Sequence, residues 1–188
     1  ALKRLHAAGL KVPEPLAYVR LSPRQHAYTE CLVEEDLGTC RDSTEVLKAH
    51  IAAGREDAVD AFERELVRST RVLIRSGLLD SDHRLPNYVV TPAGVPVRLD
   101  FELARRVLFP RLHSRLYGLT LGALIGSYVF AVQPDQRRMA VFAQRLVEGL
   151  QPPAGALRVA ERRIARMLER QRREIGLDTR FTPPWSPS

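Results

Sequence analysis

The stretch from 80 to 102, DSDHRLPNYVVTPAGVPVRLDFE, constrains the fold of this chain more than any other part of it. Two short runs of β-favouring residues, 88–91 and 96–99, flank Pro92-Ala93-Gly94-Val95, where Pro and Gly favour a chain reversal. The pattern predicts a tight β-hairpin. Because Asp and Asn residues stand just outside both strands, the hairpin is expected to carry polar side chains at its open end.

The register of this hairpin decides which polar side chains meet. If Thr91 faces Pro96, the antiparallel pairing continues outward to Asn87 opposite Asp100. Directly opposed residues have Cα atoms about 4.5–5.5 Å apart, so an amide oxygen and a carboxylate would converge. Mg²⁺ takes few protein oxygens and completes its coordination with waters and substrate phosphates, which suits one Asn and one Asp. Asn87 and Asp100 are therefore the predicted metal ligands.

The spacing of these polar residues resembles the catalytic loop of protein-kinase-like enzymes. Asp82 and Asn87 match the Asp and Asn of that loop, and Asp100-Phe101-Glu102 matches the Asp-Phe-Gly that follows it. The resemblance implies that Asp82 orients the acceptor hydroxyl and that Arg84 faces the transferred phosphate. Asn87 and Asp100 would hold the Mg²⁺ that accompanies ATP.

Three residues depart from the family pattern. Asp80 stands where the family usually has the His of His-Arg-Asp, His83 replaces an apolar residue, and Glu102 replaces the glycine of Asp-Phe-Gly. Because no Ala-Pro-Glu segment follows, the chain resembles bacterial small-molecule and lipopolysaccharide kinases more closely than regulated protein kinases. The alternative is a surface hairpin whose Asp and Asn residues only form turns.

The first 37 residues resemble the end of helix C and the hinge of a kinase. Apolar residues at helical spacing over 2–10 predict a helix, a Pro-rich turn and a strand follow, and 25–33 predicts a second strand. The segments LHAAGLKVPEP and LVEEDL are similar to those of lipopolysaccharide core sugar kinases of the heptose and Kdo type. This resemblance implies that the backbone near Val33 and Glu34 meets adenine. An ordinary helix and two strands with a solvated acidic run is the alternative.

A kinase also needs a glycine-rich loop, a strand lysine and a helix glutamate, and none of these is visible in the sequence. Since the chain begins with Ala rather than Met, we expect a fragment that starts inside helix C. Residues 1–37 would be the remnant of the N-terminal lobe and 38–178 the helical C-terminal lobe, with the catalytic loop at 80–87 and the metal-binding residues at 100–102. Residues 179–188 are predicted to form a disordered tail.

Helical periodicity predicts helices over 44–53, 57–75, 117–133, 136–150 and 157–175. The run 117–133 is uncharged and has glycines at four-residue intervals, which is typical of packed transmembrane helices, but it is at the short limit for crossing a bilayer. A fully buried central helix is the favoured interpretation. The arginine-rich helix 157–175 would either lie against anionic headgroups or a phosphorylated substrate, or dock its apolar side on the domain, which is slightly favoured.

The net charge of +7 points to anionic partners, and nucleic acid, an anionic membrane and a phosphosugar all satisfy it. No zinc finger, aromatic RNA-binding motif or helix-turn-helix signature selects nucleic acid. The two cysteines, Cys31 and Cys40, make neither a disulfide framework nor a metal site, and no secretory signal is visible. A cytoplasmic location is expected, with peripheral contact at the inner face of the inner membrane as a further hypothesis.

The sequence therefore predicts an α+β chain of protein-kinase-like fold, mostly the helical C-terminal lobe with a short catalytic β-hairpin and hinge strands. The predicted function is ATP-dependent transfer of the γ-phosphoryl group to a hydroxyl of a lipopolysaccharide core sugar, an anionic sugar or glycolipid acceptor. The alternatives are a small-molecule kinase of the antibiotic type, a non-catalytic pseudokinase and a basic membrane-surface binding module.

Overall fold

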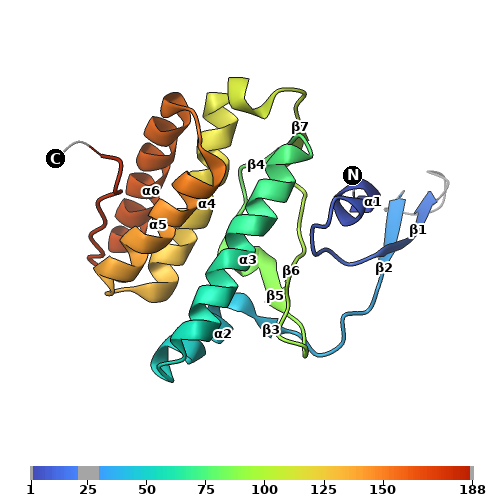
Figure 1. Ribbon diagram of the computed structural model, residues 1–188, viewed down its shortest axis with the longest axis horizontal. Helices are drawn as coiled ribbons and strands as arrows, with labels where there is room; N and C mark the ends of the chain where they lie inside the picture. Colours follow the sequence, from blue (N-terminus) through green and yellow to red (C-terminus); the bar gives the residue numbers. More distant parts are fainter. Residues whose placement is uncertain (1, 21–29, 187–188) are drawn as a thin grey trace.

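The computed structural model describes residues 2–20 and 30–186 (Figure 1). The chain is a mixed α+β protein, 57% helical with small antiparallel sheets, which confirms the expected α+β class. The helices are α1 (Leu2–Ala7), α2 (Ser43–Ala52), α3 (Glu56–Arg75), α4 (Ser114–Val132), α5 (Gln136–Leu150) and α6 (Ala154–Ile175), with short 3₁₀ helices η1 (Leu85–Asn87) and η2 (Pro110–Leu112). The strands are β1 (Pro15–Arg20), β2 (Glu30–Glu34), β3 (Arg41–Asp42), β4 (Leu78–Asp80), β5 (Tyr88–Val90), β6 (Pro96–Arg98) and β7 (Ala104–Arg106).

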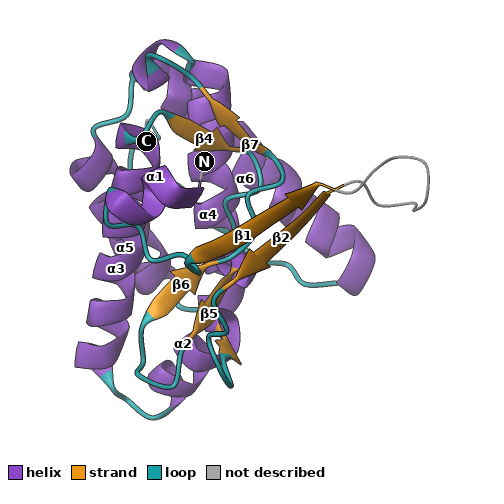
Figure 2. Cartoon of the chain, turned by 90° about the vertical axis from the view of Figure 1, so that its right-hand side faces the viewer, coloured by secondary structure: helices purple, strands orange, loops and turns teal. Residues whose placement is uncertain are grey.

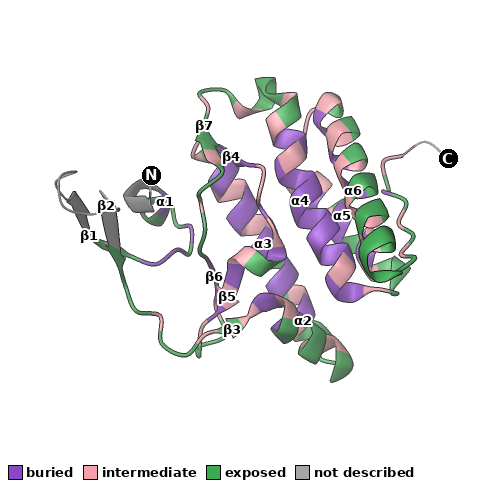
Figure 3. Cartoon of the chain, turned by 180° about the vertical axis from the view of Figure 1, so that it is seen from behind, coloured by how far each residue is buried: buried purple, intermediate pink, exposed green. Residues whose placement is uncertain are grey.

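Helix α4 forms the centre of the helical part of the molecule. It packs against α2, α5 and α6, and Figure 3 shows it buried over most of its length. Among the described residues it is the one helix long and apolar enough to cross a membrane, but 78% of its most apolar window is buried inside the protein. The prediction of a buried central helix is therefore confirmed.

The glycines of α4 allow α6 to approach closely. A Cβ atom added at Gly118 would lie 2.5 Å from Cβ of Val159, and one added at Gly122 would lie 2.7 Å from Cβ of Arg163. The stripe of glycines therefore serves helix packing within this chain. The apolar side of α6 docks on α4 through buried Ala156, Ala160 and Ile164, as the favoured interpretation predicts.

Helices α2, α3 and α5 begin and end close to the predicted positions because their apolar faces and caps are local in the sequence. The Asp42 carboxylate caps α2 by accepting from the N–H groups of Thr44 and Glu45. The Asp135 carboxylate accepts from the N–H of Arg138 and caps α5 in the same way.

The predicted hairpin is present as β5–β6, but its register differs from the prediction by one residue. Tyr88 pairs with Arg98, and the N–H of Leu99 donates to the carbonyl of Asn87 at 3.0 Å. Asn87 therefore lies opposite Leu99, and the predicted pairing with Asp100 is wrong. Because side chains alternate between the two faces of a strand, Arg98 rather than Leu99 points into the interior.

The shorter loop causes this shift. The N–H of Gly94 donates to the carbonyl of Thr91 at 2.9 Å, and Gly94 has a left-handed φ of 77°. The N–H of Thr91 in turn donates to the carbonyl of Val95 at 3.0 Å, so the connection has three residues rather than the predicted four. A turn followed by a left-handed glycine is the usual form of a three-residue hairpin loop.

Two further strand pairings were not predicted. Strand β3 pairs with β5 and extends the hairpin to three strands, and β4 pairs with β7 in a separate sheet. The second pairing sets Asp80 opposite Ala104. It therefore holds the start of the loop 81–87 beside the segment that follows the hairpin.

The N-terminal segment forms a helix, a turn and a strand, as predicted. Leu5 and Leu10 pack on Leu73 of α3 and Leu78 of β4, and the carbonyl of Lys11 accepts from the N–H of Arg98. Strands β1 and β2 form a hairpin that projects from the helical body (Figure 2). Strand β2 covers residues 30–33 of the predicted second strand, and positions 25–29 of that prediction lie outside the described residues.

The C-terminal segment differs from the predicted disordered tail. Phe181 and Trp185 pack against the hydrophobic core, Pro183 is buried, and the Ser186 hydroxyl donates to Glu161 of α6 at 2.8 Å. Phe181 and Trp185 supply apolar surface that packs on the core. The Pro-rich segment has no helical or strand periodicity, so the sequence does not predict this packing. Residues 179–186 are thus part of the packed structure, and positions 187–188 lie outside the described residues.

Candidate functional site

The loop between β4 and β5 brings together three of the predicted site residues. Nε of Arg84 lies 2.7 Å from Oδ1 of Asp82, and Nη2 of Arg84 donates to Oδ2 of Asp82 at 3.0 Å. Nδ2 of Asn87 donates to the carbonyl oxygen of Asp82 at 2.8 Å and to its Oδ2 at 3.0 Å. The Asp82 carboxylate, whose side chain is 22% exposed, is therefore fixed by a guanidinium and an amide.

Helices α4 and α2 hold the backbone of this loop. The N–H of Asp80 donates to the hydroxyl of Thr120 at 3.0 Å, and the N–H of Leu85 donates to the hydroxyl of Ser127 at 2.9 Å. The Ser43 hydroxyl donates to the carbonyl of Leu85 at 2.6 Å. Thr120 and Ser127 of the apolar helix α4 thus satisfy buried backbone groups, which would otherwise be costly to bury.

The amide of Asn87 is oriented by its hydrogen bonds. Because Nδ2 donates to two oxygens of Asp82, Oδ1 points away from that residue and has no hydrogen-bond donor among the described residues. A carbonyl oxygen in this state is available to a cation.

Asp100 lies just after the hairpin and is exposed. Its Oδ1 accepts from the N–H of Glu102 at 2.8 Å, whereas Oδ2 has no donor in the described part of the chain. Oδ1 of Asn87 and Oδ2 of Asp100 are oxygens of the kind that Mg²⁺ accepts, and no hydrogen bond joins the two side chains among the described residues. Across the described ranges, no group of three or more His, Cys, Asp or Glu side chains is placed to hold a metal ion.

A buried arginine connects the loop to Asp100. Arg98 is 1% exposed and forms an ion pair with Asp80, which is also 1% exposed. Its Nε and Nη2 donate to the carbonyl of Asp100 at 3.0 and 2.7 Å, and its guanidinium carbon lies 5.5 Å from the ring centre of Tyr88 and 5.2 Å from that of Phe101. Burial raises the pKa of Asp80, while the positive charge of Arg98 opposes this rise.

His83 completes this network in its neutral form. Nη1 of Arg98 lies 2.6 Å from Nδ1 of His83, and since a guanidinium only donates, Nδ1 is the acceptor. The proton is therefore on Nε2, which donates to the hydroxyl of Thr70 at 2.9 Å, and that hydroxyl donates to the carbonyl of Leu66. Burial lowers the pKa of His83 well below its usual value, and the charge of Arg98 lowers it further.

This network was missed by the sequence reasoning. Asp80 and His83 were noted only as departures from a family pattern, and Arg98 was assigned only to a strand. The available signal was an arginine inside a β-favouring run, two residues before Asp100, with a carboxylate at the other end of the segment. The one-residue error in register concealed it because that register directs Leu99 inward instead.

The two residues predicted to contact adenine lie on a different element from the loop 80–87. Val33 and Glu34 are at the end of β2, and both are exposed. Among the described residues, no hydrogen bond or ion pair joins either of them to the loop 80–87. The structure thus groups Asp82, Arg84 and Asn87. Arg98 links the backbone of Asp100 to Asp80 and His83, and Val33 and Glu34 lie on a separate hairpin.

No family model matches the chain, and a search of curated proteins finds no significant match.

Proposed function

We propose that this chain is the catalytic part of an ATP-dependent phosphotransferase of protein-kinase-like fold. The observation that carries the proposal is the grouping of Asp82, Arg84 and Asn87 on one loop, together with the contact of Arg98 with both Asp80 and the Asp100 carbonyl. Phosphoryl transfer depends mainly on positioning and on electrostatic stabilisation. A loop held by buried hydrogen bonds supplies the positioning.

Each residue has a role that follows from its contacts. Asp82 would accept a hydrogen bond from the acceptor hydroxyl, because its carboxylate is half-buried and fixed in direction. Oδ1 of Asn87 and the Asp100 carboxylate would hold Mg²⁺, and the bound nucleotide would supply the phosphoryl group. Arg84 would offer positive charge near the transferred group. The resemblance to kinases, rather than a contact, is the ground for proposing that the backbone near Val33 and Glu34 contacts adenine.

The acceptor class rests on charge. The net charge of +7 favours an anionic acceptor, and a hydroxyl on a lipopolysaccharide core sugar, as part of a glycolipid at the inner face of the inner membrane, satisfies this requirement. We propose a cytoplasmic location as well, because the proposed phosphoryl donor is ATP.

Mg²⁺-dependent ATP binding tests the proposal. Calorimetric titration of the chain with ATP and Mg²⁺ should show binding that Asp100→Asn weakens by roughly tenfold or more, because a metal-bound carboxylate becomes a neutral amide. The matched control is Glu148→Gln on α5, which removes one exposed carboxylate outside the predicted site and should leave binding unchanged. Absence of ATP binding in the natural sequence, or equal losses in both variants, contradicts the proposed function.

A non-catalytic pseudokinase is the second candidate because Arg84 already neutralises the Asp82 carboxylate. An engaged carboxylate is a weaker hydrogen-bond acceptor for a substrate hydroxyl. This candidate predicts ATP binding without turnover in any acceptor screen, and Arg84→Gln would then leave ATP binding intact. Measurable phosphoryl transfer that Asp82→Asn abolishes would exclude it.

A further inference from the structure

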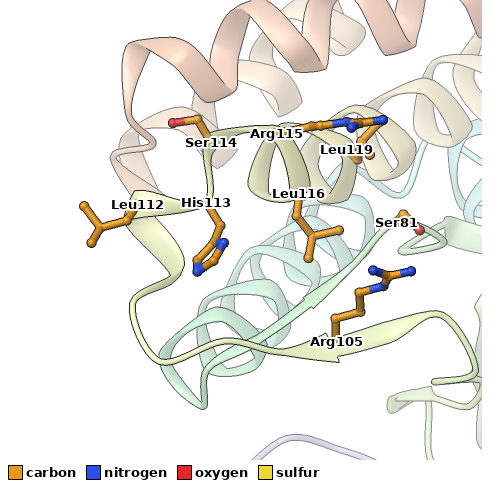
Figure 4. Close-up of a pocket in the computed structure, with 8 residues that line it drawn as sticks. All are labelled: Ser81, Arg105, Leu112, His113, Ser114, Arg115, Leu116 and Leu119. Atoms are coloured by element: carbon orange, nitrogen blue, oxygen red, sulfur yellow. The ribbon is translucent and has the colours of Figure 1, made fainter.

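A cleft of about 610 Å³ opens beside the loop that carries Asp82. Figure 4 shows Arg105 rising from β7 toward Ser81, while His113 and Leu116 extend from the start of α4 into the same space. The remaining lining residues are Leu112, Ser114, Arg115 and Leu119. The cleft is therefore lined by two arginines, a histidine and two hydroxyls, and by no carboxylate.

A second cavity continues this cleft along α6. Arg115 and Leu119 line both cavities, and the second, of about 740 Å³, adds Arg162, Arg163 and Arg166. No carboxylate lines this cavity either. Nε of Arg163 is buried and has no hydrogen-bond partner in the described part of the chain. We call the two cavities together the basic groove.

The arginines of the basic groove differ from many others on this molecule. Arg68, Arg84, Arg138, Arg145, Arg170 and Arg173 each pair with a carboxylate. Within residues 2–20 and 30–186, none of the five groove arginines has such a partner. A concave surface lined by charge of one sign concentrates counter-ions, and here those are anions.

The position of the groove relates it to the proposed reaction. Ser81 lines the cleft and directly precedes Asp82 in the chain, so a ligand in the groove would lie beside the loop that carries this carboxylate. We propose that the basic groove binds an anionic group of the acceptor, a phosphate or carboxylate, and so places a hydroxyl of the same molecule at Asp82. This inference rests on the proposed function for the last step, whereas anion binding itself does not.

Two sources of such an anionic group are chemically equivalent: a free sugar phosphate and the headgroup of a lipid. The connection between β7 and α4 offers a way to tell the two sources apart. It exposes Leu108 (82%), Phe109 (66%) and Leu112 (79%), and Leu112 also lines the cleft. Apolar side chains among arginines are suited to the interface of an anionic bilayer. A lipid source would use these side chains, and a soluble source would not.

The first experiment measures anion binding without ATP or Mg²⁺, so that its result is independent of the nucleotide site. Titration of ¹⁵N-labelled protein with inorganic phosphate should perturb the Arg105 and Arg115 side-chain signals, and Arg105→Gln/Arg115→Gln should weaken binding by roughly tenfold or more. The matched control, Arg106→Gln/Arg158→Gln, removes the same charge from exposed sites outside the groove and should change binding little. Absent binding, or equal loss in the two double variants, overturns the proposal.

The second experiment identifies the source of the anion. Sedimentation with phosphatidylcholine vesicles that contain about 30% phosphatidylglycerol tests the lipid source. If the source is a lipid, both Arg105→Gln/Arg115→Gln and Leu108→Ser/Phe109→Ser should abolish vesicle binding, while only the first should weaken phosphate binding. If the source is soluble, phosphate binds as above and vesicles do not sediment the protein. Vesicle binding that survives the arginine substitutions and requires only Leu108 and Phe109 counts against the groove.

Discussion

The helix pair α4–α6 and the hairpin β5–β6 both contribute to the interior of this protein, but different forces hold them. Between the helices, glycine and alanine allow close approach, and dispersion and apolar burial stabilise the contact. Below the hairpin, a guanidinium, a carboxylate and an imidazole are buried together, each satisfied by the others. The contact between α4 and α6 depends little on polar side chains, so losing one of them should cost little. Losing Arg98 or Asp80 instead leaves the other charge buried without a partner.

This difference has a functional meaning. The close-packed helices form a rigid support for the loop 80–87. Thr120 and Ser127 of α4 bind the loop to this support by accepting hydrogen bonds from its backbone. The ionic network then fixes Asp100 relative to the loop through the contacts of Arg98. If the site transfers a phosphoryl group, helix packing holds the loop 80–87 in place. The contacts of the buried Arg98 then hold Asp100 beside that loop.

The largest expected effect comes from breaking the ion pair. Arg98→Met removes the cation but leaves Asp80 buried, and loss of one partner of a buried pair costs about 3–5 kcal/mol of the free energy of unfolding. Urea denaturation followed by circular dichroism measures this loss. The paired control is Asp80→Asn/Arg98→Met, which removes both charges and keeps an acceptor for the N–H of Asp82.

The double variant should be more stable than Arg98→Met alone, since no unpaired charge remains buried. A double variant as unstable as Arg98→Met, or less stable, would show that an unpaired buried charge is not the cause of the loss. The hairpin region would then not differ from the helix pair in the way described above.

An intermediate effect is expected where the helices cross. Gly122→Ala would place a Cβ 2.7 Å from Cβ of Arg163 and 2.9 Å from the carbonyl oxygen of Ala160, so α6 must move away. Overpacking of this kind costs about 1–3 kcal/mol, which exceeds the gain of about 1 kcal/mol from the better helix propensity of alanine. The melting temperature and the urea midpoint should both fall.

Gly155→Ala is the comparison for this substitution. A Cβ there would meet only the Ser114 side chain, at 3.2–3.3 Å, and a side chain adjusts more easily than a backbone carbonyl. The loss of stability should therefore be smaller than for Gly122→Ala. An equal or larger loss would mean that close approach at Gly122 is not what holds α6 on α4.

The two regions also differ in how far the sequence predicts them. The helices could be predicted because their apolar residues recur at a fixed local spacing, and the burial of α4 followed from its composition. The hairpin could be predicted as an element, but its register depended on one left-handed glycine, Gly94. Arg98 contacts Asp80 of β4 and His83, and His83 in turn contacts Thr70 of α3, and no local pattern encodes such long-range pairing.

The grouping of Asp82, Arg84 and Asn87 could be anticipated because all three lie within one short loop. Their contacts could not, since the sequence does not show that Arg84 pairs with Asp82. The packed segment 179–186 was missed for a related reason: its proline content suggests disorder, while Phe181 and Trp185 find apolar surface only in the folded protein.

The smallest expected effect concerns the pH dependence of the ionic region. Burial lowers the pKa of His83, so the folded protein keeps the imidazole neutral while the unfolded chain takes up a proton near pH 6.5. The unfolded state then binds more protons below that pH, and stability falls as the pH decreases. From about pH 7.5 to about pH 5.5 this costs roughly 1 kcal/mol, with a limiting slope of about 1.4 kcal/mol per pH unit.

His83→Gln should remove that slope, because glutamine does not titrate and its amide oxygen can still accept from Arg98. Asp80 works in the opposite direction, since its raised pKa makes the folded state take up a proton first as the pH falls, and it is present in both proteins. The informative quantity is therefore the difference between the two proteins in how their urea unfolding free energies change with pH. Parallel pH profiles would show that the imidazole titrates equally in the folded and unfolded states, which a ring held between Arg98 and Thr70 should not do.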